Sequence, residues 1–220
     1  TGQTHGGRVS GNALLECKQP GWPLSFELNA EDLNVESFLE KSFDVKNQMI
    51  GQMFAATSFR APLNQPGLTT GRGKIEIRKG KLIGTPIMQK IGSVFNISEF
   101  QEIPFDTLHT DFTVTNRVVH LSDLELASHS IRVNGGGTVD FEGQYALDLI
   151  LSISPRLRNQ LPQYIQNQLR ENPNGMFSTP QFRVFGKGNR PETDLLTVFG
   201  IQVLQNLSNR DIKKAADDLK

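Results

Sequence analysis

The sequence predicts a β-dominated α+β fold, in which a curved antiparallel sheet forms a gutter flanked by amphipathic helices. Two observations predict it. Between residues 70 and 153 apolar residues recur with period two, and tight turns separate the repeats. These turns are too short for the crossover helices that parallel strands require, so neighbouring strands should run antiparallel. The chain is expected to form a single domain, 1–220, because no linker-like segment divides it.

The N-terminal third is predicted to contain three strands and one helix. The strands lie at 8–17, 24–28 and 50–59. The helix is expected at 34–43, where apolar residues follow helical spacing and Asn34 can cap the first turn. The strand 50–59 is apolar on both faces. It is therefore either buried on both sides or covered on the second side by something outside this chain.

The central block is predicted to form successive hairpins around one short helix. The strands lie at 75–78, 108–115, 119–126, 131–141 and 145–153. The helix is expected at 87–94, after Pro86. The apolar phase slips by one residue after Leu121, which predicts a β-bulge at Ser122-Asp123. The run Gly135-Gly136-Gly137 lies between strands, where it predicts a bend or a close approach of two backbones.

The pattern changes after the last long strand. Residues 157–169 have helical spacing, and Pro162 is expected to begin or kink that helix. A short strand follows at 182–186, and a helix is expected at 194–207. The last helix has an apolar stripe that can close the core or cap an open groove. The capping residues would be Leu195, Leu196, Phe199 and Val203.

The composition argues against several classes of function. Lys+Arg 23 balance Asp+Glu 23, which leaves no electrostatic footprint for nucleic acid. The four histidines are scattered and the serines form no nucleophile elbow, so we expect no enzyme activity, no catalytic residue, no metal and no cofactor. His109 and His120 are expected to be exposed on the polar side of neighbouring strands. Cys17, the single cysteine, is expected to be a buried structural thiol.

The ends of the chain bear on its context. The sequence begins at Thr1 rather than at a methionine, and no apolar run approaches the roughly 20 residues that span a bilayer. We therefore expect a fragment of a larger protein, with any membrane anchor upstream of it.

The region 50–207 resembles the C-terminal region of the AsmA-like family of the Gram-negative envelope, which includes TamB and YdbH-like proteins. The resemblance rests on spaced motifs of glycine, apolar and acidic residues. In this sequence they are GRGKIEIRKGKLIG, IPFDTL, VHLSDLELAS and GGGTVD, followed by the closing segment FRVFGKGNRPETD. Two features depart from the family pattern: the N-terminal membrane helix is absent, and the loop 156–179 is longer and richer in Gln and Asn.

The resemblance implies a curled sheet with an apolar lining that carries phospholipid acyl chains across the periplasm. The full-length protein would be anchored in the inner membrane, with a role in outer-membrane assembly and a possible envelope protein partner. The residues expected to contact lipid are Ile75, Ile77, Leu108, Phe112, Val114, Leu147, Leu149 and Leu151. The alternative is a structural or protein-interaction domain without a lipid ligand, whose apolar face is an ordinary core sealed by the helices.

Overall fold

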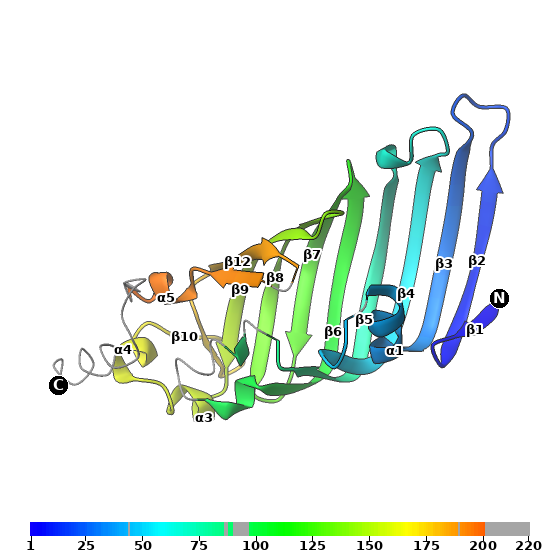
Figure 1. The fold of residues 1–220 in the computed structure, drawn as a ribbon. Coiled ribbons are helices and arrows are strands. Elements are labelled where there is room, and N and C mark those ends of the chain that lie inside the picture. Colours follow the sequence, from blue (N-terminus) through cyan, green and yellow to red (C-terminus); the bar gives the residue numbers. More distant parts are fainter. Residues whose placement is uncertain (44, 86–87, 90–96, 189, 201–220) are drawn as a thin grey trace.

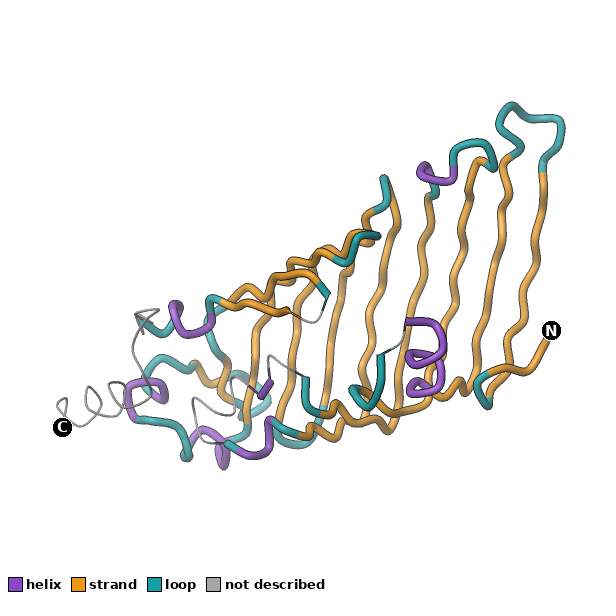
Figure 2. The backbone as a smooth tube through the Cα atoms, in the orientation of Figure 1, coloured by secondary structure: helices purple, strands orange, loops and turns teal. Residues whose placement is uncertain are grey.

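The fold was obtained as a computed structural model that describes residues 1–43, 45–85, 88–89, 97–188 and 190–200. It is one open antiparallel sheet of 13 strands, with short helices at its margins (Figures 1 and 2). The long strands follow the chain order from β2 to β9, each paired with the next. Their bounds are β2 (Gly7–Leu15), β3 (Pro23–Asn34), β4 (Met49–Pro62), β5 (Thr70–Ile83), β6 (Glu102–Thr115), β7 (Val118–Ala127), β8 (Ile131–Asp140) and β9 (Gln144–Ile153).

Shorter strands extend both margins of the sheet. At the N-terminal margin β1 pairs with the first residues of β2, and at the C-terminal margin β11 and β12 both pair with β9. The short strands are β1 (Gly2–Thr4), β10 (Arg170–Glu171), β11 (Phe177–Ser178), β12 (Phe182–Lys187) and β13 (Arg190–Thr193). The helical elements are α1 (Val35–Phe43), η1 (Pro66–Leu68), η2 (Ser98–Phe100), α3 (Pro155–Arg158), α4 (Gln163–Gln166) and α5 (Leu195–Val198).

The alternating strand directions give the sheet two different ends. At one end, which we call the hairpin end, the strands are joined by the loops 16–22, 63–69, 116–117 and 141–143. At the opposite end, which we call the helix end, lie α1, η2, α3 and α4, and β13 leads back to this end and into α5. Figure 1 shows α1, α3 and α4 gathered along this margin. The helices can therefore cover one part of the sheet and not the other.

The pairing register separates the sheet into an apolar and a polar face. One continuous row of paired residues crosses from β3 to β9 on the apolar face: Leu28, Thr57, Gly73, Phe112, Leu121, Gly137 and Leu147. The neighbouring row lies on the opposite, polar face: Glu27, Ser58, Arg72, Thr113, His120, Thr138 and Ala146. Residues that alternate between apolar and polar in the sequence thus lie on opposite faces of the sheet, as expected for a sheet with one buried face.

The hydrophobic core fills the apolar face at the helix end. Each covering element contributes side chains that are almost completely buried there, including Val35 of α1, Phe100 of η2 and Leu195 of α5. Leu157 within α3 and Ile165 within α4 are fully buried as well. The cavity among these side chains measures only about 20 Å³, close to the volume needed for one water molecule. This half of the apolar face is therefore a closed core.

Several local predictions are confirmed. The Ser37 amide donates to Asn34 Oδ1 at 2.7 Å, which is the N-cap bond of α1. The register of β7 against β8 shifts between Leu121 and Leu124, and Asp123 has φ 49°, so the bulge lies where the phase slip predicts it. A Cβ on Gly135 or Gly137 would collide with the backbone of β9, which explains the close approach predicted for these glycines.

Other predictions require correction. The helix expected at 157–169 is replaced by two single turns, α3 and α4, because Pro162 lies at the N-cap of α4 and cannot continue a helix. Strands β1, β10, β11 and β13 are not predicted by the sequence, since two to four residues carry too little periodicity. The helix expected at 87–94 lies largely outside the described residues. The helix expected at 194–207 is a single turn, α5, which ends at Val198 because Gly200 takes a left-handed φ of 70°. Residues 201–207 lie outside the described residues.

Strand β4 is the strand that the sequence predicts to be apolar on both faces. Its phenylalanine on the polar face of the sheet, Phe54, is covered by another residue of this chain. Phe54 of β4 pairs with Glu76 on the polar face. The guanidinium carbon of Arg78 lies 4.4 Å from the centre of its ring, a cation–π contact. Arg78 is held by Glu76, to which its Nε donates at 2.7 Å. No partner outside the chain is needed to account for Phe54.

Candidate apolar binding face

The candidate site is the part of the apolar face that no described helix covers. It occupies the hairpin-end half of β2 to β6, and we call it the uncovered strip. Its members share the apolar face and are Ala13, Leu15, Leu24, Phe26, Leu28, Thr57, Phe59, Ala61, Gly71, Gly73, Phe112 and Val114. Exposure falls along the strip: Leu28 on β3 is 42% exposed, Phe59 on β4 is half-buried, and Phe112 on β6 is buried. The strip is therefore most open toward the N-terminal margin.

A row of phenylalanine rings forms the floor of the strip. Phe26 and Phe59 are stacked, with ring centroids 5.2 Å apart, and Phe59 and Phe112 are tilted at 6.2 Å. Phe59 and Phe112 lie on β4 and β6, so their contact must cross β5. It can do so because β5 carries Gly71 and Gly73 at these positions. A Cβ on Gly71 would collide with the Phe59 ring, and one on Gly73 would lie 2.7 Å from Phe112 Cζ.

The register places all eight residues expected to contact lipid on the apolar face, as their spacing predicts. They divide between its two halves. Phe112 and Val114 belong to the uncovered strip. Ile77, Leu149 and Leu151 belong to the core, while Ile75, Leu108 and Leu147 are partly buried against it. Lipid contact by any of them stays a prediction.

The segment expected to cap a groove is partly described. Leu195 and Phe199 are almost completely buried, and they line the small core cavity together with Leu161 and Ile165. Leu196 packs against the core from its margin. Val203 lies outside the described residues. This burial favours the core-closing interpretation of the segment over a movable cap.

The polar face is a network of ion pairs between neighbouring strands. Lys74 Nζ lies 3.0 Å from Asp111 Oδ2, and Arg183 Nε donates to Asp148 Oδ1 at 2.8 Å. The hydrogen bond from Arg183 lowers the pKa of the Asp148 carboxyl below its usual value. All of these groups are largely exposed, so the network contributes solubility and register more than stability.

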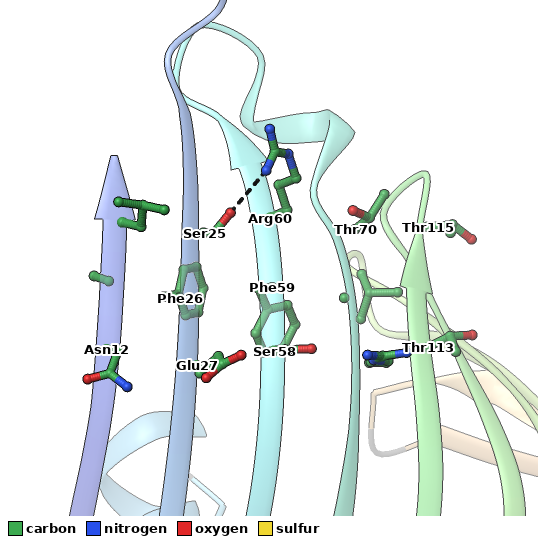
Figure 3. A pocket seen from close by; sticks show the side chains of 15 residues that line it. Asn12, Ser25, Phe26, Glu27, Ser58, Phe59, Arg60, Thr70, Thr113 and Thr115 are labelled. Atoms are coloured by element: carbon green, nitrogen blue, oxygen red, sulfur yellow. Dashed lines mark hydrogen bonds between the residues drawn. The ribbon is translucent and has the colours of Figure 1, made fainter. Parts of the chain in front are cut away.

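A groove of about 680 Å³ also adjoins this face (Figure 3). Two polar-face rows flank it near the hairpin end. The first comprises Asn12, Glu27, Ser58, Arg72 and Thr113, and the second Leu14, Ser25, Arg60, Thr70 and Thr115. The row between them, which includes Phe26, Phe59 and Val114 of the uncovered strip, completes the lining. Glu27 is the one carboxylate of this lining, so the groove has no carboxylate pair that could serve as acid and base. We therefore do not assign a catalytic role to this groove.

Within the described chain, no group of three or more His, Cys, Asp and Glu side chains is arranged to hold a metal ion. His109 and His120 lie on the polar face, paired with Glu125 and Thr113. His120 is exposed as expected, whereas His109 is half-buried between its strand neighbours. Cys17 is exposed, contrary to the buried thiol expected, because it lies in the loop after β2 rather than within the strand.

Among the described helices, none is long and apolar enough to cross a bilayer. No protein-family model, curated protein or solved structure matches the chain.

The spacing of the sequence did not single out Phe26, Leu28 or Phe59 as site residues. The alternation of β3 already placed Phe26 and Leu28 on one face. The signal that could have identified the site is the pair Gly71 and Gly73 on β5. Glycines at these positions leave room for aromatic rings from the two neighbouring strands to meet over β5.

Proposed function

We propose that this protein binds acyl chains of phospholipids in the uncovered strip and performs no catalysis there. The observation that carries the proposal is the contrast between the two halves of one apolar face. At the helix end the face is filled by covering side chains, whereas at the hairpin end the strip is half-buried to exposed on β2, β3 and β4 and is buried only at Phe112 and Val114 on β6. A contiguous exposed apolar surface of this kind is typical of a binding surface rather than of an ordinary sheet exterior.

The size and composition of the strip suit an acyl chain. Five strands at about 4.8 Å spacing make it about 19 Å wide across the strand direction. Burying ten methylene groups there would contribute roughly 8 kcal/mol, at about 0.8 kcal/mol for each, before the cost of ordering the chain. The floor of stacked rings offers no polar group that would need a partner under an apolar ligand.

The motifs shared with the AsmA-like family support the same function and add a cellular context. We propose that the chain is a module of a membrane-anchored periplasmic protein that conducts phospholipid between the two membranes, with a role in outer-membrane assembly. The Gly71-x-Gly73 motif, which contributes to that resemblance, is also what permits the aromatic floor.

The alternative is an interaction domain without a lipid ligand, and the closed core at the helix end favours it for that half of the sheet. Under this alternative another protein would cover the strip. The two proposed functions differ in whether phospholipid remains bound to the protein when it is purified from cells.

Native mass spectrometry of protein purified without detergent tests the proposal. We expect phospholipid masses on the wild-type protein, and their loss in Leu28→Asp, which places a charge on the strip at a position exposed enough to tolerate it. The matched control is Asn29→Asp, on the same strand but on the exposed polar face, which should retain the lipid. A lipid-free wild-type protein, or a folded Leu28→Asp variant that retains lipid, would contradict the proposal.

A further inference from the structure

The exposed apolar side chains of this protein gather at the hairpin end. Ten large apolar residues are exposed among the described residues, and six of them lie in or beside the loops of this one end. They are Leu14, Leu15, Trp22, Leu63, Leu68 and Phe141. In Figure 1 the loops of the hairpin end follow one slanting line along the upper margin of the sheet. We call this set the apolar rim.

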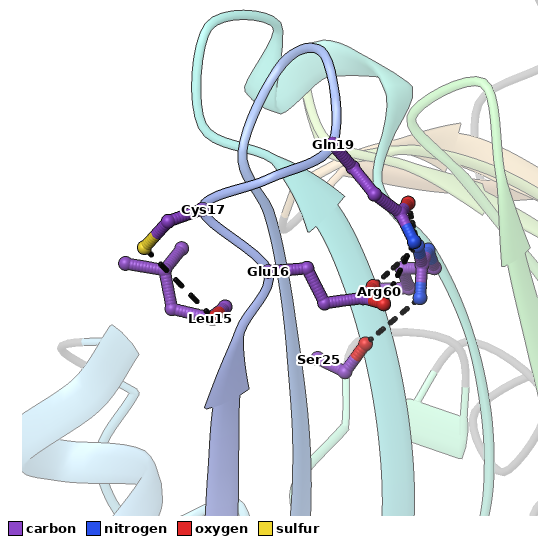
Figure 4. Close-up of polar contacts among 6 residues, drawn as sticks. All are labelled: Leu15, Glu16, Cys17, Gln19, Ser25 and Arg60. Carbon is purple, nitrogen blue, oxygen red and sulfur yellow. Dashed lines mark hydrogen bonds and ion pairs between the residues drawn. The ribbon is translucent and has the colours of Figure 1, made fainter.

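Polar contacts within and between two loops of the hairpin end hold part of the apolar rim in its exposed position. Arg60 of β4 fastens the first loop: its Nη2 lies 2.6 Å from Glu16 Oε2 and donates to Gln19 Oε1 at 3.1 Å (Figure 4). The Leu63 amide donates to the Gly21 carbonyl at 3.0 Å and joins the first loop to the second. Trp22, between these anchors, is 60% exposed. Two braced loops thus hold apolar side chains in water.

The charge of these loops indicates which surface they fit. The loop 63–69 has no charged residue, and the loop 16–22 has only Lys18 besides the paired Glu16. The loops 116–117 and 141–143 add one cation, Arg117, and one anion, Glu142. No basic cluster is available to attract anionic headgroups. Tryptophan combines an apolar ring with one N–H donor and is favoured at the boundary between headgroups and acyl chains.

From these observations we propose that the apolar rim inserts into the interface of a zwitterionic lipid bilayer. The rim residues project from separate hairpin tips. Separate tips can each enter a fluid interface, whereas a protein partner would need a continuous complementary surface. Insertion of the apolar rim into a bilayer is a separate function from acyl-chain binding in the uncovered strip. It does not require that binding, because all rim residues except Leu15 lie outside the strip.

The experiment uses Trp22, the only tryptophan of the chain, as its own reporter. Phosphatidylcholine vesicles are added to the protein and the Trp22 emission is recorded, with brominated phosphatidylcholine as a quencher. We expect a blue shift, quenching by the brominated lipid, and co-flotation with the vesicles.

Leu63→Ser/Leu68→Ser should weaken vesicle binding at least about tenfold, because two half-exposed leucines no longer enter the bilayer. The matched control is Tyr164→Ser, a residue of equal exposure (52%, as for Leu68) at the helix end, which should bind normally. Leu28→Asp should keep vesicle binding even where it loses bound lipid, which separates this proposal from acyl-chain binding.

The proposal would be overturned by an unchanged emission with phosphatidylcholine, by binding of Leu63→Ser/Leu68→Ser equal to that of the wild type, or by binding only to anionic vesicles. A blue shift that depends on protein concentration without vesicles would assign the rim to a protein interface instead, and would overturn it as well.

Discussion

Leu149 and Leu28 form a matched pair that tests whether the two halves of the apolar face differ as described. Each leucine lies on the apolar face over a glycine of the neighbouring strand. A Cβ on Gly135 would lie 2.8 Å from Leu149 Cδ2, and one on Gly11 would lie 2.8 Å from Leu28 Cδ2. They differ in cover: Leu149 is 8% exposed within the core, and Leu28 is 42% exposed. We therefore substitute each with alanine.

The expected losses follow from this difference. Truncating a core leucine removes its transfer free energy and leaves a cavity, so Leu149→Ala should lower the free energy of unfolding by about 2–5 kcal/mol. Leu28 buries little more than half of its surface and its removal opens no closed cavity. Leu28→Ala should therefore cost less than about 1.5 kcal/mol.

Urea unfolding followed by circular dichroism measures both variants. At a slope of about 3 kcal/mol per molar urea, a loss of 3 kcal/mol moves the midpoint by about 1 M. Equal midpoint shifts for the two variants would refute the division into a closed core and an uncovered strip. A larger shift for Leu28→Ala would refute it as well.

Three further perturbations test other parts of the account. Asn34→Ala should lower the free energy of unfolding by about 1 kcal/mol through loss of the cap bond to Ser37, while Asn34→Asp, which keeps an acceptor, should cost far less; thermal melts compare them. Arg183→Gln should raise the pKa of Asp148 toward its usual value in an NMR titration, whereas Arg183→Lys should raise it less; an unchanged pKa would mean that the pair does not form in solution. Because the pKa of Asp148 is lowered in the folded state, the ion pair stabilises the folded protein at pH values above the usual aspartate pKa. This stabilisation is lost as the pH falls through the lower, folded-state pKa. The free energies of unfolding of Arg183→Gln and wild type should therefore differ least at the lowest pH. Gly71→Val should displace the Phe59 ring from its contact with Phe112, seen as altered ring resonances in NMR spectra, while Thr70→Val on the other face should leave them unchanged.

The strands and their faces could be predicted from the sequence because period two is a local property. The bulge after Leu121 and the cap at Asn34 were predictable for the same reason, since each depends on a few adjacent residues. The division of the apolar face could not be predicted. Leu28 and Leu149 have similar local patterns, and only the tertiary position of the helices covers one and leaves the other open.

The row of phenylalanine rings could not be predicted from a local sequence pattern either. Phe59 and Phe112 are 53 positions apart, and their contact depends on β5 lying between their strands with glycines at the right register. The helix expected at 157–169 failed for a different reason. Its apolar spacing is real, and Leu157 and Ile165 are buried, but Pro162 divides the segment into two turns that bury the same residues.

The most direct test of acyl-chain binding is a cross-linking map with a fatty acid that carries a photoreactive diazirine near its methyl end. After irradiation the protein is digested, and the modified residues are identified by mass spectrometry. The account predicts adducts on the uncovered strip, foremost at Phe26, Leu28 and Phe59, that a tenfold excess of unmodified fatty acid suppresses. Adducts confined to polar-face side chains, such as Ser58 and Arg72, or to the helix end, or adducts that competition does not suppress, would contradict it.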